Sequence, residues 1–158
     1  MRDGERRRLG KRMRAERAAA SAPARPDGMA VAWCDGGSRG NPGPAAYGYV
    51  IEDAGGAELA REAAALGVAT AATAEYRAVH AALERALALG LAALEVRSDS
   101  RLLIGHLTGT VRPRNPTLAE HGDAIRQLAG RVGAVRYSWV PRTGNMLADG
   151  LLAAHLGM

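Results

Sequence analysis

The sequence predicts a mixed α/β domain, on three observations. Its first half contains short extended segments joined by turns rich in Gly and Pro, which is typical of β-hairpins. Its second half alternates helical spacing of apolar residues with short strands, which is typical of helical crossovers in a sheet. The length of 158 residues, with 47% hydrophobic and 23% charged residues, fits one folded domain. We therefore expect five strands, the first three antiparallel.

The elements are predicted in order along the chain. The strands are expected at 29–35, 47–53, 58–67, 93–98 and 134–140. A turn over 36–46 joins the first two strands. The third strand is ambiguous because Ala and Glu also favour helices, and regular hairpin spacing favours a strand. Apolar residues three and four positions apart predict helices at 73–89, 100–107, 117–132 and 146–156.

The basic charge of the chain is confined to its first 28 residues. They hold nine Arg or Lys against four Asp or Glu, whereas residues 29–158 hold twelve of each. We interpret residues 1–28 as a disordered or transiently helical tail and residues 29–158 as the domain. The tail is interpreted as a solvated linker, an upstream start-codon artefact or an arm for non-specific phosphate contacts. The first two interpretations are favoured, because a charge run is usually solvated.

Composition also excludes several classes of protein. No apolar run reaches the roughly 18 residues that a membrane span needs. The single cysteine, Cys34, excludes an intrachain disulfide and a cysteine zinc site, and it is expected in the core. Trp33 and Trp139 lie in predicted strands and are expected in the core as well. We expect a monomer in the cytoplasm without membrane partners.

Four carboxylates stand out by their positions: Asp35, Glu75, Asp99 and Asp149. Each has a structural explanation, namely a turn-initiating Asp, an anion in the first turn of a helix, a helix N-cap and an exposed helical Asp. Three of them lie where a strand or turn meets a helix, so their side chains can converge. Converging carboxylates repel unless divalent cations lie between them. Oxygen ligands suit Mg²⁺ or Mn²⁺, and two such ions catalyse phosphodiester hydrolysis.

Four segments of the chain resemble, in order, the signature segments of type 1 ribonucleases H. They read CDGGSRGNPGPAAYG, TAEYRAV, SDSRLLI and VPRTGNMLAD. The likeness runs from about Met29 to the end of the chain. It is strongest to the compact bacterial and archaeal variety, which lacks the basic helical protrusion of other members.

The resemblance implies a five-stranded ribonuclease H fold and hydrolysis of the RNA strand of an RNA–DNA hybrid, leaving 5′-phosphate and 3′-hydroxyl ends. The four carboxylates match the family's catalytic metal ligands for two Mg²⁺ or Mn²⁺ ions, and Glu75 would also contact the ribose 2′-OH. Arg142 matches an arginine of compact members that would neutralise the scissile phosphate or the product. A plain surface arginine is nearly as good an explanation.

The resemblance also implies contacts with the hybrid. The matching positions are Gly36, Gly37, Ser38, Arg39, Gly40, Asn41 and Thr70. In the glycine-rich turn, backbone amides would approach the RNA closely. Thr70 would hold a DNA phosphate, a role compatible with capping the helix that follows.

The sequence departs from the family pattern at several positions. Ala71 and Ala72 replace a common Asn pair that reaches the minor groove, and Val111 replaces a frequent aromatic residue. His106 replaces a frequent Gln, and we interpret it as a partly exposed helical histidine. The loop before the last helix contains no histidine.

These departures leave two alternatives to hybrid cleavage open. One is a nuclease with a shifted substrate, such as RNA–DNA junctions or double-stranded RNA. The other is a catalytically silent module that binds hybrids, against which all four carboxylates argue.

Overall fold

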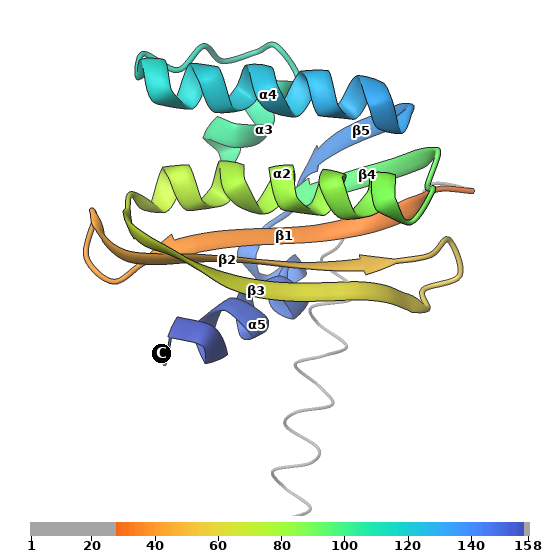
Figure 1. The fold of residues 1–158 in the computed structure, drawn as a ribbon, viewed down its shortest axis with the longest axis horizontal. Coiled ribbons are helices and arrows are strands. Elements are labelled where there is room, and N and C mark those ends of the chain that lie inside the picture. The colour runs from red at the N-terminus through yellow and green to blue at the C-terminus, as the bar shows by residue number, and fades with distance from the viewer. Residues whose placement is uncertain (1–27, 157–158) are drawn as a thin grey trace, which may run out of the picture.

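The computed structural model describes residues 28–156, with the side chain of Leu147 excepted, and shows a five-stranded sheet with helices on both faces (Figure 1). The strand order is β3-β2-β1-β4-β5. The strands span Ala30–Ser38 (β1), Gly43–Glu52 (β2), Glu58–Ala69 (β3), Ala93–Ser98 (β4) and Ala134–Trp139 (β5). β1 pairs with β2 and β2 with β3 in antiparallel fashion, while β4 pairs in parallel with both β1 and β5.

The helices form two layers. One face of the sheet carries α2 (Ala71–Ala88), α3 (Arg101–Leu107) and α4 (Pro116–Val132), and the other carries α5 (Met146–Leu156), after a short 3₁₀ turn (Figure 1). No helix among residues 28–156 is long and apolar enough to cross a membrane.

The predicted fold class is confirmed, and every predicted strand and helix is present. The largest boundary error concerns the first hairpin, and α2 also begins at Ala71, two residues before its predicted start. The predicted turn over 36–46 is largely sheet, because β1 continues to Ser38, which pairs with Ala45 of β2. The connection between the strands is therefore only residues 39–42. Residues 1–27 of the predicted tail lie outside the described part of the chain.

Side-chain alternation along β1 divides the core in two. Ala30, Ala32 and Cys34 pack with α2, α3 and α4 in the larger cluster. Val31 and Trp33 point to the other face and pack with Val50, Ala148 and Leu151 in a smaller one. The predictions of a buried Cys34 and a core Trp33 are confirmed.

Candidate active site

Two of the four carboxylates meet because β1 and β4 are parallel neighbours. Trp33 pairs with Arg97, so two residues further along each chain the register brings Asp35 beside Asp99. Since side chains alternate between faces, both carboxylates lie on the face that α5 covers. The carboxyl ends of parallel strands are a common location for functional side chains.

Glu75 reaches the same place from α2. The Thr70 hydroxyl accepts a 3.1 Å hydrogen bond from the Thr73 N–H and so begins the helix. Glu75 is consequently the fifth helical residue and not in the first turn, contrary to the sequence-based expectation. A Cβ at Gly36 would overlap the backbone of Ala74 and Glu75. Gly36 therefore allows α2 to pack close enough to bring Glu75 beside Asp35.

Asp149 lies in the first turn of α5, and its position depends on a residue that sequence reasoning missed. The Asn145 side chain is fully buried, and its Nδ2 donates a 2.8 Å hydrogen bond to the carbonyl of Cys34, directly before Asp35. The Asn145 carbonyl accepts from the Asp149 N–H at 3.0 Å. Asn145 thus fixes the start of α5 to the end of β1. A polar residue just before an apolar helix was the only signal for it in the sequence.

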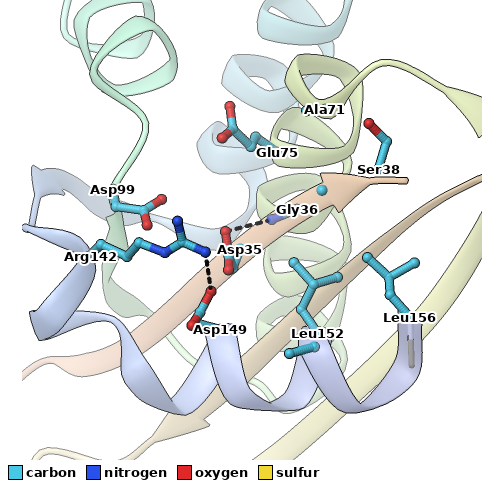
Figure 2. A pocket seen from close by; sticks show the side chains of 12 residues that line it. Asp35, Gly36, Ser38, Ala71, Glu75, Asp99, Arg142, Asp149, Leu152 and Leu156 are labelled. Atoms are coloured by element: carbon cyan, nitrogen blue, oxygen red, sulfur yellow. Dashed lines mark hydrogen bonds and ion pairs between the residues drawn. The ribbon is translucent and has the colours of Figure 1, made fainter. Parts of the chain in front are cut away.

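The four carboxylates line one open pocket of about 420 Å³ (Figure 2). Its other lining residues are Gly36, Gly37, Ser38, Ala71, Arg142, Leu152, Ala153 and Leu156. The Ser38 hydroxyl is inaccessible to solvent and has no hydrogen-bond partner in the part of the chain that the structure describes.

Burial and mutual repulsion raise the pKa values of three of these carboxyls. The pKa of Asp35 rises to about 8, first through burial and then through the charges of Asp99 and Asp149, although the Gly36 N–H opposes the shift. Burial raises the pKa of Glu75 to about 7 against a hydrogen bond from Ser100. Burial also raises the pKa of Asp99, while Arg142 acts to lower it. The pocket therefore concentrates negative charge that the protein only partly compensates.

Arg142 supplies part of that compensation. Its side chain is 78% exposed, yet the guanidinium lies between Asp99 and Asp149, with Nη2 3.4 Å from Asp149 Oδ1 (Figure 2). It is thus directed at the carboxylates, unlike a plain surface arginine.

The donor set fits a divalent cation of the Mg²⁺ type, because it consists of carboxylate oxygens whose negative charge the protein only partly compensates. Within residues 28–156, no group of three or more His, Cys, Asp or Glu side chains has a geometry that could hold a metal ion.

The predicted substrate contacts lie along one edge of the pocket. Gly36, Gly37 and Ser38 line it at the end of β1. Arg39, Gly40 and Asn41 form the exposed turn beyond, where Gly40 has a φ of 74°.

This turn is tied to the start of α2. The Asn41 Oδ1 accepts a 3.1 Å hydrogen bond from the Ala71 N–H, beside the Thr70 cap. Asn41 and Thr70 thus have structural roles at a helix N-terminus, which is also a favourable place for a phosphate.

Three other expectations need correction. Asp99 does not cap α3; Ser100 does, by accepting from the Leu103 N–H. His106 is buried, with Nδ1 2.7 Å from the Tyr76 hydroxyl, because it faces α2 and α4. Trp139 is 36% exposed: its indole N–H donates to the Asp99 carbonyl, and Arg101 stacks on its ring at 3.9 Å.

Comparison with known proteins agrees with this geometry. Residues 33–155 match the family model described as reverse transcriptase-like. Ribonuclease HI of Halobacterium salinarum is 40% identical over 124 residues, covering 78% of this chain and 62% of the relative. The bifunctional protein Rv2228c of Mycobacterium tuberculosis is 41% identical over 118 residues, covering 74% of this chain and 32% of the relative. The chain thus spans from about a third to under two thirds of the length of these relatives.

Two solved structures extend the comparison. The crystal structure of ribonuclease H1 from Halobacterium salinarum superposes with a TM-score of 0.79 at 38% identity, covering 82% of this chain and 98% of that one. LC11-RNase H1, solved in complex with an RNA/DNA hybrid, has a TM-score of 0.75 at 35% identity, covering 81% and 99%. Together with the fold and the family model, these likenesses show that the chain belongs to the ribonuclease HI family.

Proposed function

We propose that this protein is a ribonuclease H that hydrolyses the RNA strand of RNA–DNA hybrids with divalent metal ions, leaving 5′-phosphate and 3′-hydroxyl ends. The observation that carries the proposal is the pocket in which Asp35, Glu75, Asp99 and Asp149 meet from four separate elements. A related protein, LC11-RNase H1, was crystallised with such a hybrid, which supports the choice of substrate.

In this proposal the four carboxylates hold two Mg²⁺ or Mn²⁺ ions. Such ions, when bound, activate a water molecule and stabilise the leaving 3′ oxygen. Glu75, on the helix side of the pocket, contacts the ribose 2′-OH and so selects RNA. Arg142, already directed at the carboxylates, neutralises the scissile phosphate or the released product.

The rest of the pocket edge positions the hybrid. Gly36, Gly37 and Ser38, which line the pocket at the end of β1, present backbone to the RNA. The N-terminus of α2 at Thr70, together with the turn 39–41, holds a phosphate of the DNA strand, because the first N–H groups of a helix attract anions.

A shifted substrate remains the second candidate, and the observation that favours it is Ala71. This residue lines the carboxylate pocket and has no side-chain donor or acceptor to read the minor groove. A silent binding module is disfavoured, because four clustered carboxylates would repel a phosphate backbone without contributing to binding.

The deciding experiment uses one end-labelled RNA strand annealed to DNA, annealed to RNA, or joined to DNA at a single junction. Each duplex is incubated with Mg²⁺, Mn²⁺ or EDTA. We expect metal-dependent cutting of the DNA-paired RNA alone. Cutting of both duplexes, or of the junction alone, would establish a shifted substrate. If the protein binds the hybrid but cuts none of the duplexes with either metal ion, the silent binding module is the correct interpretation.

We further propose that the protein acts as a monomer in the cytoplasm. Residues 1–28, if they act as an arm, add phosphate contacts that weaken as salt rises. Deleting residues 1–28 and comparing the salt dependence of hybrid binding tests that role.

A further inference from the structure

Among the four carboxylates of the pocket, Asp99 is the one whose main chain lies outside the regular elements. It follows the last residue of β4 and precedes the N-cap of α3. The β4–β5 ladder ends here: Ser98 pairs with Trp139, and the Val140 N–H donates to the Ser98 carbonyl at 2.9 Å. The Asp99 carbonyl lies one residue beyond this ladder, so its position depends on another donor.

The indole of Trp139 provides that donor. Its N–H donates a 3.1 Å hydrogen bond to the Asp99 carbonyl, although the two residues are 40 positions apart in the chain. An indole N–H can only donate, so this contact specifies the position of an acceptor. The acceptor is the main chain of a carboxylate that lines the pocket.

The indole is itself held by the turn to which it is bonded. Arg101, the first residue of α3, lies with its guanidinium 3.9 Å from the centre of the Trp139 ring. This cation–π contact restrains a tryptophan that is 36% exposed. Inside the turn, the Ser98 hydroxyl accepts a 3.1 Å hydrogen bond from the Ser100 N–H. Residues 98–101 and Trp139 thus form one connected unit, with Asp99 inside it.

A shift of this unit would move the Asp99 carboxylate. The side chain of aspartate is short, so its carboxylate follows a displacement of the main chain. Asp99 lines the pocket together with three other carboxylates, which repel it (Figure 2). A neutral donor bonded to the main chain of Asp99 opposes a displacement by this repulsion and leaves the charge of the pocket unchanged.

We propose that Trp139 is a positioning residue, whose indole N–H holds the Asp99 main chain so that the Asp99 carboxylate is directed at a divalent cation in the pocket. The inference rests on the proposed function, because it concerns the cation site of that proposal. Removing a hydrogen-bond partner of a metal ligand typically costs roughly 10–100-fold in metal affinity. Trp139 acts through a single bond to the main chain, so we expect a loss at the lower limit, about 10-fold.

The other tryptophan of the chain offers a matched control. The Trp33 indole N–H donates a 2.8 Å hydrogen bond to Glu52 Oε1, and the Arg97 guanidinium lies 4.8 Å from the ring centre. Neither Glu52 nor Arg97 lines the carboxylate pocket. Trp33→Phe therefore removes the same donor, beside the same type of cation, without releasing a carboxylate of the pocket.

The test compares the wild type, Trp139→Phe and Trp33→Phe as full chains. The first measurement needs no catalysis: it is the rise in melting temperature that Mn²⁺ produces without hybrid. The second is the Mg²⁺ concentration that gives half of the maximal rate of hybrid cleavage. For Trp139→Phe we expect both readouts to require about 10-fold more metal, with the maximal rate recovered at high Mg²⁺ and the KM for hybrid unchanged. For Trp33→Phe we expect wild-type metal requirements, even where its melting temperature in EDTA is lower.

The outcomes separate this inference from the proposed function. Wild-type metal requirements in Trp139→Phe, or an equal rise in both variants, would overturn the positioning role of Trp139 and leave the proposed function intact. A wild-type protein that is neither stabilised by Mn²⁺ nor able to cleave the hybrid would overturn the proposed function itself. Trp139→Tyr also lacks the indole N–H and carries the same expectation, so it replaces Trp139→Phe if that variant is unfolded in EDTA.

Discussion

The two faces of the sheet are built for different tasks. On the face under α2, α3 and α4, β1 and β4 contribute Ala, Cys, Leu and Val side chains to one large apolar cluster. On the face under α5, the same strands contribute Trp33, Asp35 and Arg97, Asp99 follows directly after β4, and the apolar cluster is small. Neighbouring residues of one strand therefore serve opposite purposes: Cys34 packs in the core, while Asp35 reaches the pocket.

This difference indicates that one face of the sheet mainly provides stability and the other mainly provides the candidate active site. Apolar burial, worth about 25 cal/mol per Å², accumulates on the α2 face. The α5 face instead holds buried charge, which costs free energy unless it is paired. Breaking either face should therefore affect one property far more than the other.

The largest effect is expected on the α5 face, from Asp99→Asn. The amide keeps the size of the side chain but loses the charge that would hold a cation, so we expect hybrid cleavage to fall by at least about 100-fold. Cleavage in Mg²⁺ and thermal melting are measured on the same preparation. Wild-type cleavage rates from this variant would contradict the assignment of the site. A lower melting temperature would show that Asp99 also contributes to stability, contrary to the proposed difference between the two faces.

The α2 face should respond in the opposite way. Leu83 is fully buried in the large cluster, so Leu83→Ala should lower the free energy of unfolding by about 2–5 kcal/mol. Urea denaturation measures the loss. Leu152→Ala, at the wall of the carboxylate pocket under α5, is the matched control and should cost less, because its site is open on one side. Equal losses from both variants would show that the two faces contribute alike.

The smallest effect concerns pH. Asp35 has a pKa of about 8 in the fold, above its ordinary value, so its neutral form is favoured in the folded state. The stability that the neutral carboxyl contributes is therefore full below about pH 4, the ordinary pKa, and is lost as pH rises through about 8, where the buried carboxyl becomes charged. Without metal, Asp35→Asn should melt at the same temperature as the wild type below about pH 4 and at least about 2 °C higher at pH 8. The measurement is thermal melting of both proteins in EDTA across this pH range. The same pH dependence in the variant and the wild type would contradict a raised pKa of Asp35.

The sequence predicted much of the site because local patterns carried the information. Asp35, Glu75, Asp99 and Asp149 each lie within or directly after a regular element, and those elements could be predicted from alternation and helical spacing. The pocket confirms that these four side chains come together. Their roles toward metal and hybrid stay predictions.

Other features were not readable from local patterns. His106 was expected on the surface, because only packing against α2 and α4 places its ring beside Tyr76. Trp139 was expected in the core. It is partly exposed because it lies at the end of β5, where its indole N–H donates a hydrogen bond to the Asp99 carbonyl. Asn145 went unnoticed, since its partner lies 111 residues away in the chain.

The order and type of the elements could be predicted from the sequence alone, because these depend on the spacing of apolar residues and on turn residues close together in the chain. Three features became visible only in the folded chain. They are the register that places Asp35 beside Asp99, the close approach of α2 over Gly36, and the anchoring of α5 through Asn145. These depend on contacts between distant segments, whose geometry no local pattern specifies. The electrostatics follow from them: the pKa of Asp35 is raised because the fold buries it and brings Asp99 and Asp149 near.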